Sequence, residues 1–372
     1  MYKHKLIGRA FLFGIVLYVL VIGITPTAVS AGNETEILNI TVGEPTKLSN
    51  VVYTNTASVA VSRTGVVAAF YPKPRTGPNF YRTSTDLGRT WGKEMDAPGV
   101  DLPLAGGTSN ATLRDGGVLK FLTTGSSFKG EAEFRVAPLE GEYIDGWFML
   151  HSTFAWFNDD FTKFEVAPVQ VYMPDAPTSP QPQLVMGKWP TFERGNMIQL
   201  DNGDLLTPLQ GSFKGDTKGR TILCISSDRG HKWHYYATVA YDPKDPNPDL
   251  PGQYLGYAEP SIELLPNGQM ICVMRTQYSH LPCEYRPMSV SWSDDRGRTW
   301  TRPEFFEPPL DWNYLGEPSP VLAISADRWL LPSLTRLDWH GRCPFGLKSF
   351  VMISRDEGRT WPRAVDVFDL WA

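Results

Sequence analysis

The chain has 372 residues, a formal net charge of −5 at pH 7, and 12 Trp, 15 Tyr and 19 Phe residues. Acidic and basic residues are interspersed and form no basic stripe, which excludes a typical nucleic-acid-binding protein. A chain of this length and apolar content can bury the core of one large domain.

The first 31 residues have the pattern of a secretory signal peptide. Basic residues precede an apolar run from Ala10 to Ile24, and small residues follow up to Ala31. This order predicts cleavage near Ala31. An uncleaved anchor is the less favoured alternative, because the apolar run is a little short for a membrane span. We therefore expect a secreted or periplasmic protein in which residues 32–372 form one domain, with no membrane span after cleavage.

One eight-residue pattern, S-x-D-x-G-x-(T/K)-W, called the box below, occurs four times. Its copies begin at Ser84, Ser226, Ser293 and Ser354. Asp followed by Gly between two apolar runs is typical of a tight hairpin, in which Gly adopts a positive φ and Asp accepts backbone hydrogen bonds. The Trp supplies a large apolar face for the next hairpin. The box therefore predicts a hairpin tip, and its Asp is expected to be structural.

A second hairpin pattern runs in phase with the box. Residues 259–275 read as strand, Asn-Gly turn and strand, and residues 317–336 form the next copy. Weaker copies cover residues 58–70, 110–122 and 197–206. One repeating unit is thus four strands, with an inner hairpin and an outer hairpin tipped by the box. Four-stranded units at this spacing predict an all-β propeller.

The blades follow in chain order, with a damaged second box near Asn158 that lacks Gly. We expect blades over residues 51–91, from about 108 to 164, and over 192–233, 259–300 and 317–361. The chain ends at Ala372 before a sixth inner hairpin begins. We therefore predict a six-bladed propeller whose last blade is incomplete at the C-terminus, with a strand over residues 37–42 closing the ring. A five-bladed ring, an open ring and a truncated gene product are the alternatives.

The cysteines do not indicate a metal site. Cys224, Cys272, Cys283 and Cys343 have no metal-ligand spacing, and neither a metal nor an organic cofactor is expected. An exported protein would permit disulfides, and the sequence leaves all three connectivities of four cysteines open.

The four boxes resemble the Asp boxes of the sialidase (neuraminidase) superfamily, which are secreted six-bladed propellers with BNR repeats. Residues 195–203 and 259–275 resemble the third and fourth blades of these enzymes. The resemblance implies a glycoside hydrolase of the exo-α-sialidase type that acts on terminal, anionic sugars of glycans. Sialidases use three arginines for the substrate carboxylate, a Tyr nucleophile assisted by a Glu, and an Asp acid/base.

Some of this machinery has a match in the sequence. The resemblance implies that Glu259 is the assisting Glu and that Arg275 is the second arginine. Arg342 matches the third arginine, with Arg336 as its rival. Tyr257, two residues before Glu259, is the candidate nucleophile, with Tyr254 as a substitute.

Other parts have no match. Residues 54–58, where the first arginine is expected, contain no arginine, and residues 73–79, where the Asp acid is expected, contain no acidic residue. The family's Tyr would lie beyond Ala372. Arg75 and Arg82 are conceivable substitutes for the missing cation.

Structural alternatives stand beside these assignments. Glu259 and Glu317 share a Glu-Pro-Ser context, which backbone bonding at the start of inner strands also explains. Tyrosines such as Tyr254 and Tyr257 are more often packing residues than nucleophiles. A non-catalytic glycan-binding propeller and a protein-interaction propeller are the alternative functions. The sugar, the linkage and the oligomeric state are open at this stage.

Overall fold

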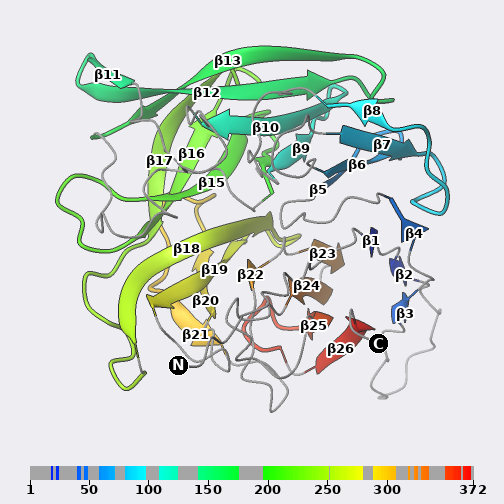
Figure 1. The fold of residues 1–372 in the computed structure, drawn as a ribbon. Coiled ribbons are helices and arrows are strands. Elements are labelled where there is room, and N and C mark those ends of the chain that lie inside the picture. The colour runs from blue at the N-terminus through cyan, green and yellow to red at the C-terminus, as the bar shows by residue number, and fades with distance from the viewer. Residues whose placement is uncertain are drawn as a thin grey trace, which may run out of the picture.

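The computed structural model describes residues 58–71, 80–97, 109–124, 141–175, 196–250, 252–279, 288–306 and 348–361, with shorter segments within 18–48, 317–334 and 363–369. Within these residues the chain forms strands and turns and no helix. The strands gather into four-stranded units around a common centre (Figure 1). The predicted all-β propeller architecture is confirmed at this level.

Blades one, four and five are separate antiparallel sheets with their strands in chain order. Blade one consists of β5 (Ser58–Val61), β6 (Val67–Tyr71), β7 (Phe80–Ser84) and β8 (Met95–Asp96). Blade four consists of β18 (Gln253–Leu264), β19 (Met270–Ser279), β20 (Met288–Ser293) and β21 (Glu304–Phe306). In blade five, β22 (Glu317–Pro318) and β23 (Leu322–Ser325) pair with β24 (Arg328–Leu334), and β25 (Lys348–Ser354) and β26 (Arg363–Asp369) follow.

Blades two and three share one nine-stranded sheet. Blade two contains β9 (Asn110–Thr112), β10 (Val118–Thr124), β12 (Trp147–Phe157) and β13 (Phe164–Met173), with β11 (Gly141–Ile144) on β12. Blade three contains β14 (Ile198–Gln199), β15 (Leu205–Gly211), β16 (Arg220–Ser226) and β17 (Lys232–Ala240). The two join where β13 pairs in parallel with β17. The hairpin of 11-residue β12 and 10-residue β13 is long enough to reach the next blade.

The N-terminal strands differ from the prediction. β3 (Ile40–Val42) lies in the segment expected to close the last blade, but it pairs with β2 (Ile22–Ile24) in a separate two-stranded sheet. A second small sheet joins β1 (Tyr18–Val19) to β4 (Thr46–Lys47). Branched apolar residues on both β2 and β3 explain this pairing. Figure 1 shows these strands between blade one and blade five. A sixth blade stays a prediction.

The four boxes are hairpin tips with one shared geometry. In each, the Ser hydroxyl accepts the Gly N–H at 2.8 or 2.9 Å. The Asp carboxylate accepts the N–H of the residue four positions later at 2.8 Å. The Trp indole donates to the Gly carbonyl at 2.9 to 3.1 Å. Hydrogen bonds from Thr90 and Thr299 lower the pKa of Asp86 and of Asp295 to about 2. The structural role predicted for the box is confirmed.

The damaged box of blade two also forms a hairpin tip. Asp160 accepts the N–H of Thr162 at 3.0 Å, and Asn158 accepts the N–H of Lys163 at 2.9 Å. Phe161 adopts the left-handed conformation with φ of 56° and is fully buried. The residue after the Asp adopts the same conformation in each intact box, with φ of 59° to 64°, so the damaged box keeps this part of the tip geometry, and Phe161 is buried between blades one and two.

Apolar residues fill the spaces between neighbouring blades. One cluster joins blades two and three around Leu119, Ile222 and Trp233, and another joins blades three and four around Leu223 and Ile262. Cys224 and Cys272 are buried in these clusters as free thiols, whereas Cys283 and Cys343 lie outside the described residues. Core packing between blades is what holds the starts of the inner strands in place.

Candidate functional site

The inner hairpins place their turns at one end of the propeller and their strand openings at the other. In blades three and four the turn is closed by the N–H groups of Gly203 and Gly268, at 3.0 and 2.8 Å from the carbonyls of Leu200 and Leu265. Gln210 and Arg275 each follow their turn glycine by seven residues (203 to 210 and 268 to 275). They therefore occupy equivalent positions at the far end of the second strand in successive blades.

Glu259 and Arg275 form an ion pair within blade four. The register between β18 and β19 shifts between Ala258 and Ser261, so Glu259 lies in a bulge within β18, directly after Ala258, which is paired with Arg275 on β19. Nη1 of Arg275 is 3.4 Å from both carboxylate oxygens of Glu259. The two side chains are 19% (Arg275) and 11% (Glu259) exposed. A charge buried to this extent needs a partner of opposite sign, and each residue supplies it for the other. The structure thus brings two predicted site residues together.

Gln210 joins this pair from blade three. Its side-chain carbonyl accepts the backbone N–H of Glu259 at 2.7 Å. Gln210 is 9% exposed and Glu259 8%. The carboxylate, the guanidinium and the amide therefore come from β18, β19 and β15. The contact to Gln210 was missed by sequence reasoning, although its position seven residues after the turn glycine was visible in the repeat.

The loop after β15 is attached to the strand that carries Glu259. The N–H of Gly219 donates to the carbonyl of Leu255 at 2.7 Å, and the N–H of Tyr257 donates to the carbonyl of Gly219 at 3.1 Å. Nζ of Lys218 donates to the carbonyl of Tyr254 at 2.6 Å. Gly256 has φ of 115°, and a Cβ there would lie 2.6 Å from Cα of Gly219. Glycine is required by this close approach, which fixes β18 to blade three.

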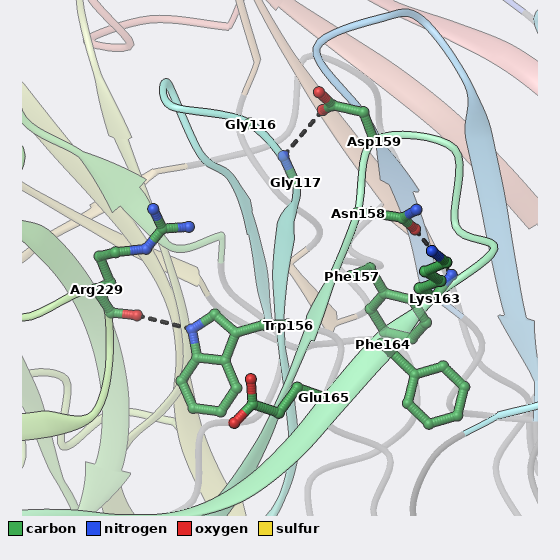
Figure 2. Close-up of a pocket in the computed structure, with 10 residues that line it drawn as sticks. All are labelled: Gly116, Gly117, Trp156, Phe157, Asn158, Asp159, Lys163, Phe164, Glu165 and Arg229. Atoms are coloured by element: carbon green, nitrogen blue, oxygen red, sulfur yellow. Dashed lines mark hydrogen bonds between the residues drawn. The ribbon is translucent and has the colours of Figure 1, made fainter.

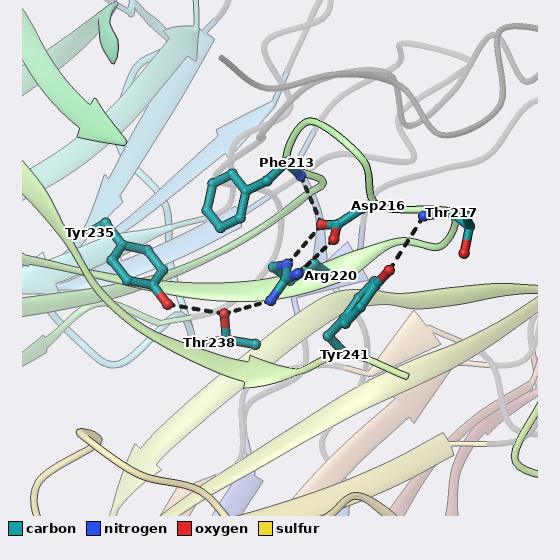
Figure 3. A network of polar contacts seen from close by, with 7 residues as sticks. All are labelled: Phe213, Asp216, Thr217, Arg220, Tyr235, Thr238 and Tyr241. Carbon is teal, nitrogen blue, oxygen red and sulfur yellow. Dashed lines mark hydrogen bonds and ion pairs between the residues drawn. The ribbon is translucent and has the colours of Figure 1, made fainter. Parts of the chain in front are cut away.

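Arg220 braces the same loop (Figure 3). Its guanidinium donates to both oxygens of Asp216 at 2.6 and 2.8 Å and to the hydroxyl of Thr238 at 2.9 Å. The rings of Phe213 and Tyr241 lie on its faces, with centroids 5.1 and 4.0 Å from Cζ. Asp216 also accepts the N–H of Phe213 at 2.8 Å. Such extensive bonding indicates a structural brace, and no sequence motif marked it.

Tyr257 lies in a packing environment. It is 2% exposed and belongs to the apolar cluster between blades three and four, with its ring 6.0 Å from that of Tyr254. Burial raises the pKa of Tyr257, and Asp242 adds to the shift. A raised pKa makes a phenol a poorer nucleophile at neutral pH. These observations favour the packing alternative, and the nucleophilic role of Tyr257 stays a prediction.

Of the other arginines considered for the site, one lies within the described residues. Arg336 and Arg342 lie outside the described residues, as do Arg75 and residues 54–57. Arg82 is on β7 of blade one, where Nε donates to the hydroxyl of Tyr71 at 3.1 Å and Nη2 lies 3.8 Å from Glu94. Arg82 is thus part of an ion-pair group within blade one.

Lys120 is a buried cation that sequence reasoning missed. It is 6% exposed, and Nζ donates to the hydroxyl of Ser58 at 2.8 Å and lies 4.7 Å from the ring centroid of Phe70. Burial lowers the pKa of Lys120 to about 7. Ser58 opens the first inner strand, directly after the residues that lack the expected arginine. In the sequence Lys120 looks like any exposed strand lysine, so nothing there marked it.

A shallow cavity of about 510 Å³ lies at the turn end of the blade-two hairpins, and Glu259 is not part of its lining. Figure 2 shows the residues that line it. Its walls come from the blade-two hairpin turns and the blade-three box: Gly116, Gly117, Trp156, Phe157, Asn158, Asp159, Lys163, Phe164, Glu165 and Arg229. Trp156 stacks on His231 with ring centroids 4.5 Å apart and donates to the carbonyl of Arg229 at 2.9 Å. His231 is exposed, as predicted for a box tip. The cavity belongs to the joint between blades.

Two kinds of feature are absent from the described residues. In that part of the chain, no cluster of three or more His, Cys, Asp or Glu side chains is placed to hold a metal ion. Across the same described segments, there is also no helix with the length and apolar character needed to cross a membrane.

Comparison with known proteins places the chain in a family. Residues 176–368 match the family model described as the BNR repeat-like domain, which is more than half of the chain. The chain belongs to the BNR repeat-like domain family. No curated protein matches its sequence.

Solved structures similar to this BNR repeat-like protein share its fold. A protein of unknown function from Dyadobacter fermentans has a TM-score of 0.54 at 18% identity, covering 84% of this chain and 81% of its own. The Hadza microbial sialidase Hz136 has the same score, identity and coverage of this chain, with 58% of its own length covered. Trypanosoma rangeli sialidase has a TM-score of 0.50 at 14% identity, and the match covers 89% of this chain and 50% of the sialidase.

The BNR repeat-like chain therefore spans about half of the length of these two sialidases. At such low identity the likeness concerns the fold. The resemblance to the sialidase superfamily is confirmed at this level, and the sialidase-like β-propeller is the fold of the protein.

Proposed function

We propose that this protein is a sialidase-type glycoside hydrolase that releases terminal, anionic sugars from glycans. The observation that carries the proposal is the Glu259–Arg275 ion pair, two partly buried opposite charges at a bulge of an inner strand. Partly buried charged groups that converge in this way are frequent at binding and catalytic centres. We include in the proposal a ring of six blades and export after cleavage near Ala31.

Arg275 has the chemistry to hold the carboxylate of an anionic sugar. A guanidinium offers five N–H donors in a planar fork that matches a carboxylate. In the structure Nη1 is directed at Glu259. A sugar carboxylate would bind to the same guanidinium, and Arg336 or Arg342 would complete the anionic-sugar site.

Glu259 is assigned the transfer of a proton. In the first step the hydroxyl of Tyr257, or of another phenol of the chain, attacks the anomeric carbon and gives its proton to Glu259, while the glycosidic C–O bond breaks and the departing oxygen takes a proton from solvent. In the second step the bond between the phenol oxygen and the anomeric carbon breaks as a water molecule leaves its hydroxyl on that carbon and its proton in solvent, and Glu259 returns its proton to the phenol. Arg275 supplies the partner of opposite charge that this largely buried carboxylate needs.

A structural neighbour supports the choice of ligand. Trypanosoma rangeli sialidase was solved with 2,3-difluoro-KDN, a nononic acid derivative, and has a TM-score of 0.51 to this chain at 14% identity. That compound carries the carboxylate that Arg275 is proposed to bind. Since the identity is low, the ligand of the neighbour supports the class of substrate only.

Turnover of a fluorogenic sialoside, against a panel of uronic-acid and neutral glycosides, tests the proposal. We expect cleavage of one or more anionic substrates and none of the neutral ones. Glu259→Gln should lower kcat by about 10²–10⁴-fold. Arg275→Met should raise KM by weakening carboxylate binding, whereas Arg302→Met, at an exposed ion pair with Asp242, should change neither constant. Equal cleavage of neutral and anionic glycosides would contradict the proposal.

A second candidate function is non-catalytic glycan binding. The burial of Tyr257 among aromatic rings favours it, because the nearest candidate nucleophile is then a packing residue. Saturable binding of anionic glycans that depends on Arg275, without turnover of any glycoside in the panel, would select this function.

A further inference from the structure

We propose that Gln210 is a positioning residue that holds the backbone of Glu259 in a left-handed conformation and thereby directs the Glu259 carboxylate at Arg275. This inference rests on the proposed function, because it concerns the same site. It adds a residue from blade three, which the family resemblance does not include among the site residues.

The backbone of Glu259 is strained. Its φ is 50°, in the left-handed region that residues with a side chain rarely adopt. The next residue is Pro260, and a residue before proline prefers an extended backbone. Two local preferences therefore oppose the observed conformation, and tertiary contacts have to stabilise it.

Gln210 supplies one such contact. At the bulge of β18 the N–H of Glu259 is turned away from the ladder with β19, whose register resumes at Ser261. A buried N–H that is left without an acceptor is costly. The carbonyl oxygen of the Gln210 side chain accepts this N–H at 2.7 Å, and both residues are buried. The bond exists only while Glu259 keeps its turned conformation.

The repeat explains why an amide stands at this position. Gln210 and Arg275 are equivalent residues of successive blades, but only the amide has an oxygen that can accept a hydrogen bond. A guanidinium at position 210 would present donors to a backbone donor. In blade three the residue at this position, Gln210, therefore binds the backbone of blade four, whereas in blade four the equivalent Arg275 supplies a positive charge.

The segment behind Gln210 is rigid enough for this task. Bonds from Gly219 to Leu255 and from Tyr257 to Gly219 fix the loop after β15 to β18 on the other side of Glu259. The Arg220–Asp216 pair, 16% and 8% exposed, braces that loop internally. Glu259 is therefore held from blade three both through its own N–H and through the preceding residues.

Three variants and one control test the proposal. Gln210→Met removes the acceptor at similar length, and Gln210→Glu retains an acceptor. Gln210→Asn keeps the amide on a shorter side chain. This variant takes the place of Gln210→Met if Gln210→Met does not fold. Gln199→Met is the control. Gln199 also accepts a backbone N–H of a neighbouring blade, that of Arg114 at 2.7 Å, but at the turn end of the hairpin.

The first measurement is hydrogen exchange at the amide of Glu259, which requires no activity. We expect Gln210→Met to accelerate this exchange by about tenfold or more, because a lost bond exposes the N–H. Gln210→Glu should retain most of the protection, and Gln199→Met should leave the Glu259 amide unchanged. Unchanged exchange in Gln210→Met, or equal acceleration in Gln199→Met, would overturn the positioning role.

The second measurement is the division of the effect between kcat and KM for an anionic glycoside. A displaced carboxylate should lower kcat by about 10²-fold with a smaller change in KM, and Gln210→Glu should recover part of the loss. A fall in kcat no larger than that of Gln199→Met would overturn the role. A wild-type protein without turnover would refute the hydrolase, while accelerated exchange confined to the Gln210 variants would still support the positioning role.

Discussion

Lys120 occupies a position that is small or apolar in the other blades. Lys120 lies four residues after the turn glycine of its inner hairpin. The residues at the same distance in blades one, three and four are Ala69, Thr207 and Cys272, each at most 1% exposed. A lysine in this place extends its ammonium group to Ser58 of blade one. Desolvation disfavours the charged form of such a buried amine, which is why its pKa falls to about 7.

Replacing Lys120 is predicted to change the pH dependence of stability. Its pKa is 10.5 in the unfolded chain and about 7 in the fold, so the unfolded state binds more protons between these values. The free energy of unfolding of the wild type should therefore rise from pH 7 to about 10. Lys120→Met should remove this rise and stabilise the protein at pH 7 by about 1–4 kcal/mol, as measured by urea unfolding.

Lys93→Met, at an exposed position of blade one, is the matched control and should keep the wild-type slope. If the rise between pH 7 and pH 10 persisted in Lys120→Met, the assignment of that titration to Lys120 would be wrong.

At the scale of elements, the boxes of blades three and five each bind to the blade before them. Trp156 donates to the carbonyl of Arg229 in the next box, and Trp292 donates to that of Glu357 at 2.8 Å. Arg359 follows the glycine of its box and lies 5.0 Å from the ring centroid of Trp292. His231 takes the corresponding place on Trp156. The box is therefore both a hairpin tip and one half of a joint.

Trp292→Phe is predicted to weaken this joint by about 1–2 kcal/mol. The substitution keeps an aromatic face for Arg359 but removes the N–H that bonds to Glu357, which leaves a polar group without its partner. Urea unfolding of the variant measures the loss. A double-mutant cycle with Arg359→Met separates the stacking contribution. The loss of stability caused by Arg359→Met in the Trp292→Phe protein reports the contact of Arg359 with an aromatic ring that lacks the indole N–H.

Trp147→Phe is the control, since Trp147 is 37% exposed on the outer hairpin of blade two. An equal loss of stability in Trp147→Phe would show that the joint contributes nothing specific.

At the scale of the whole molecule, neighbouring blades are joined in two ways. Blades one to four pack on one another through apolar clusters, and blades two and three in addition share a continuous sheet through β13 and β17. The N-terminal strands form two small sheets of their own, in which β1 and β2 fall within the predicted signal peptide. Cleavage near Ala31 would remove β1 and β2 and leave β3 and β4 to find other partners.

Export is predicted to yield a mature N-terminus close to residue 32. Mass spectrometry and N-terminal sequencing of protein recovered outside the cytoplasm measure it directly. The reason is the order of basic residues, a short apolar run and small residues that signal peptidases recognise. Mature protein that retained Tyr18 to Ile24 would contradict the prediction, and β1 and β2 would then belong to the working fold.

Features built from neighbouring residues were determined by the sequence alone. Each box forms its hydrogen bonds within eight residues, so its pattern was sufficient to predict the hairpin tip. The inner hairpins follow from Asn-Gly chemistry in the same way, and the repetition of both predicts a propeller. The pair of Glu259 and Arg275, 16 residues apart on two strands of one hairpin, was also within reach of this reasoning.

Contacts between blades were decided only by the tertiary structure. Gln210 meets Glu259 across 49 residues, and Lys120 meets Ser58 across 62. Both contacts depend on the angle at which one blade follows another, and on which side chains that angle turns toward each other. The same holds for the burial of Tyr257. A local pattern specifies a hairpin, but only packing of the ring determines which of its polar residues face a neighbouring blade and which become part of the core.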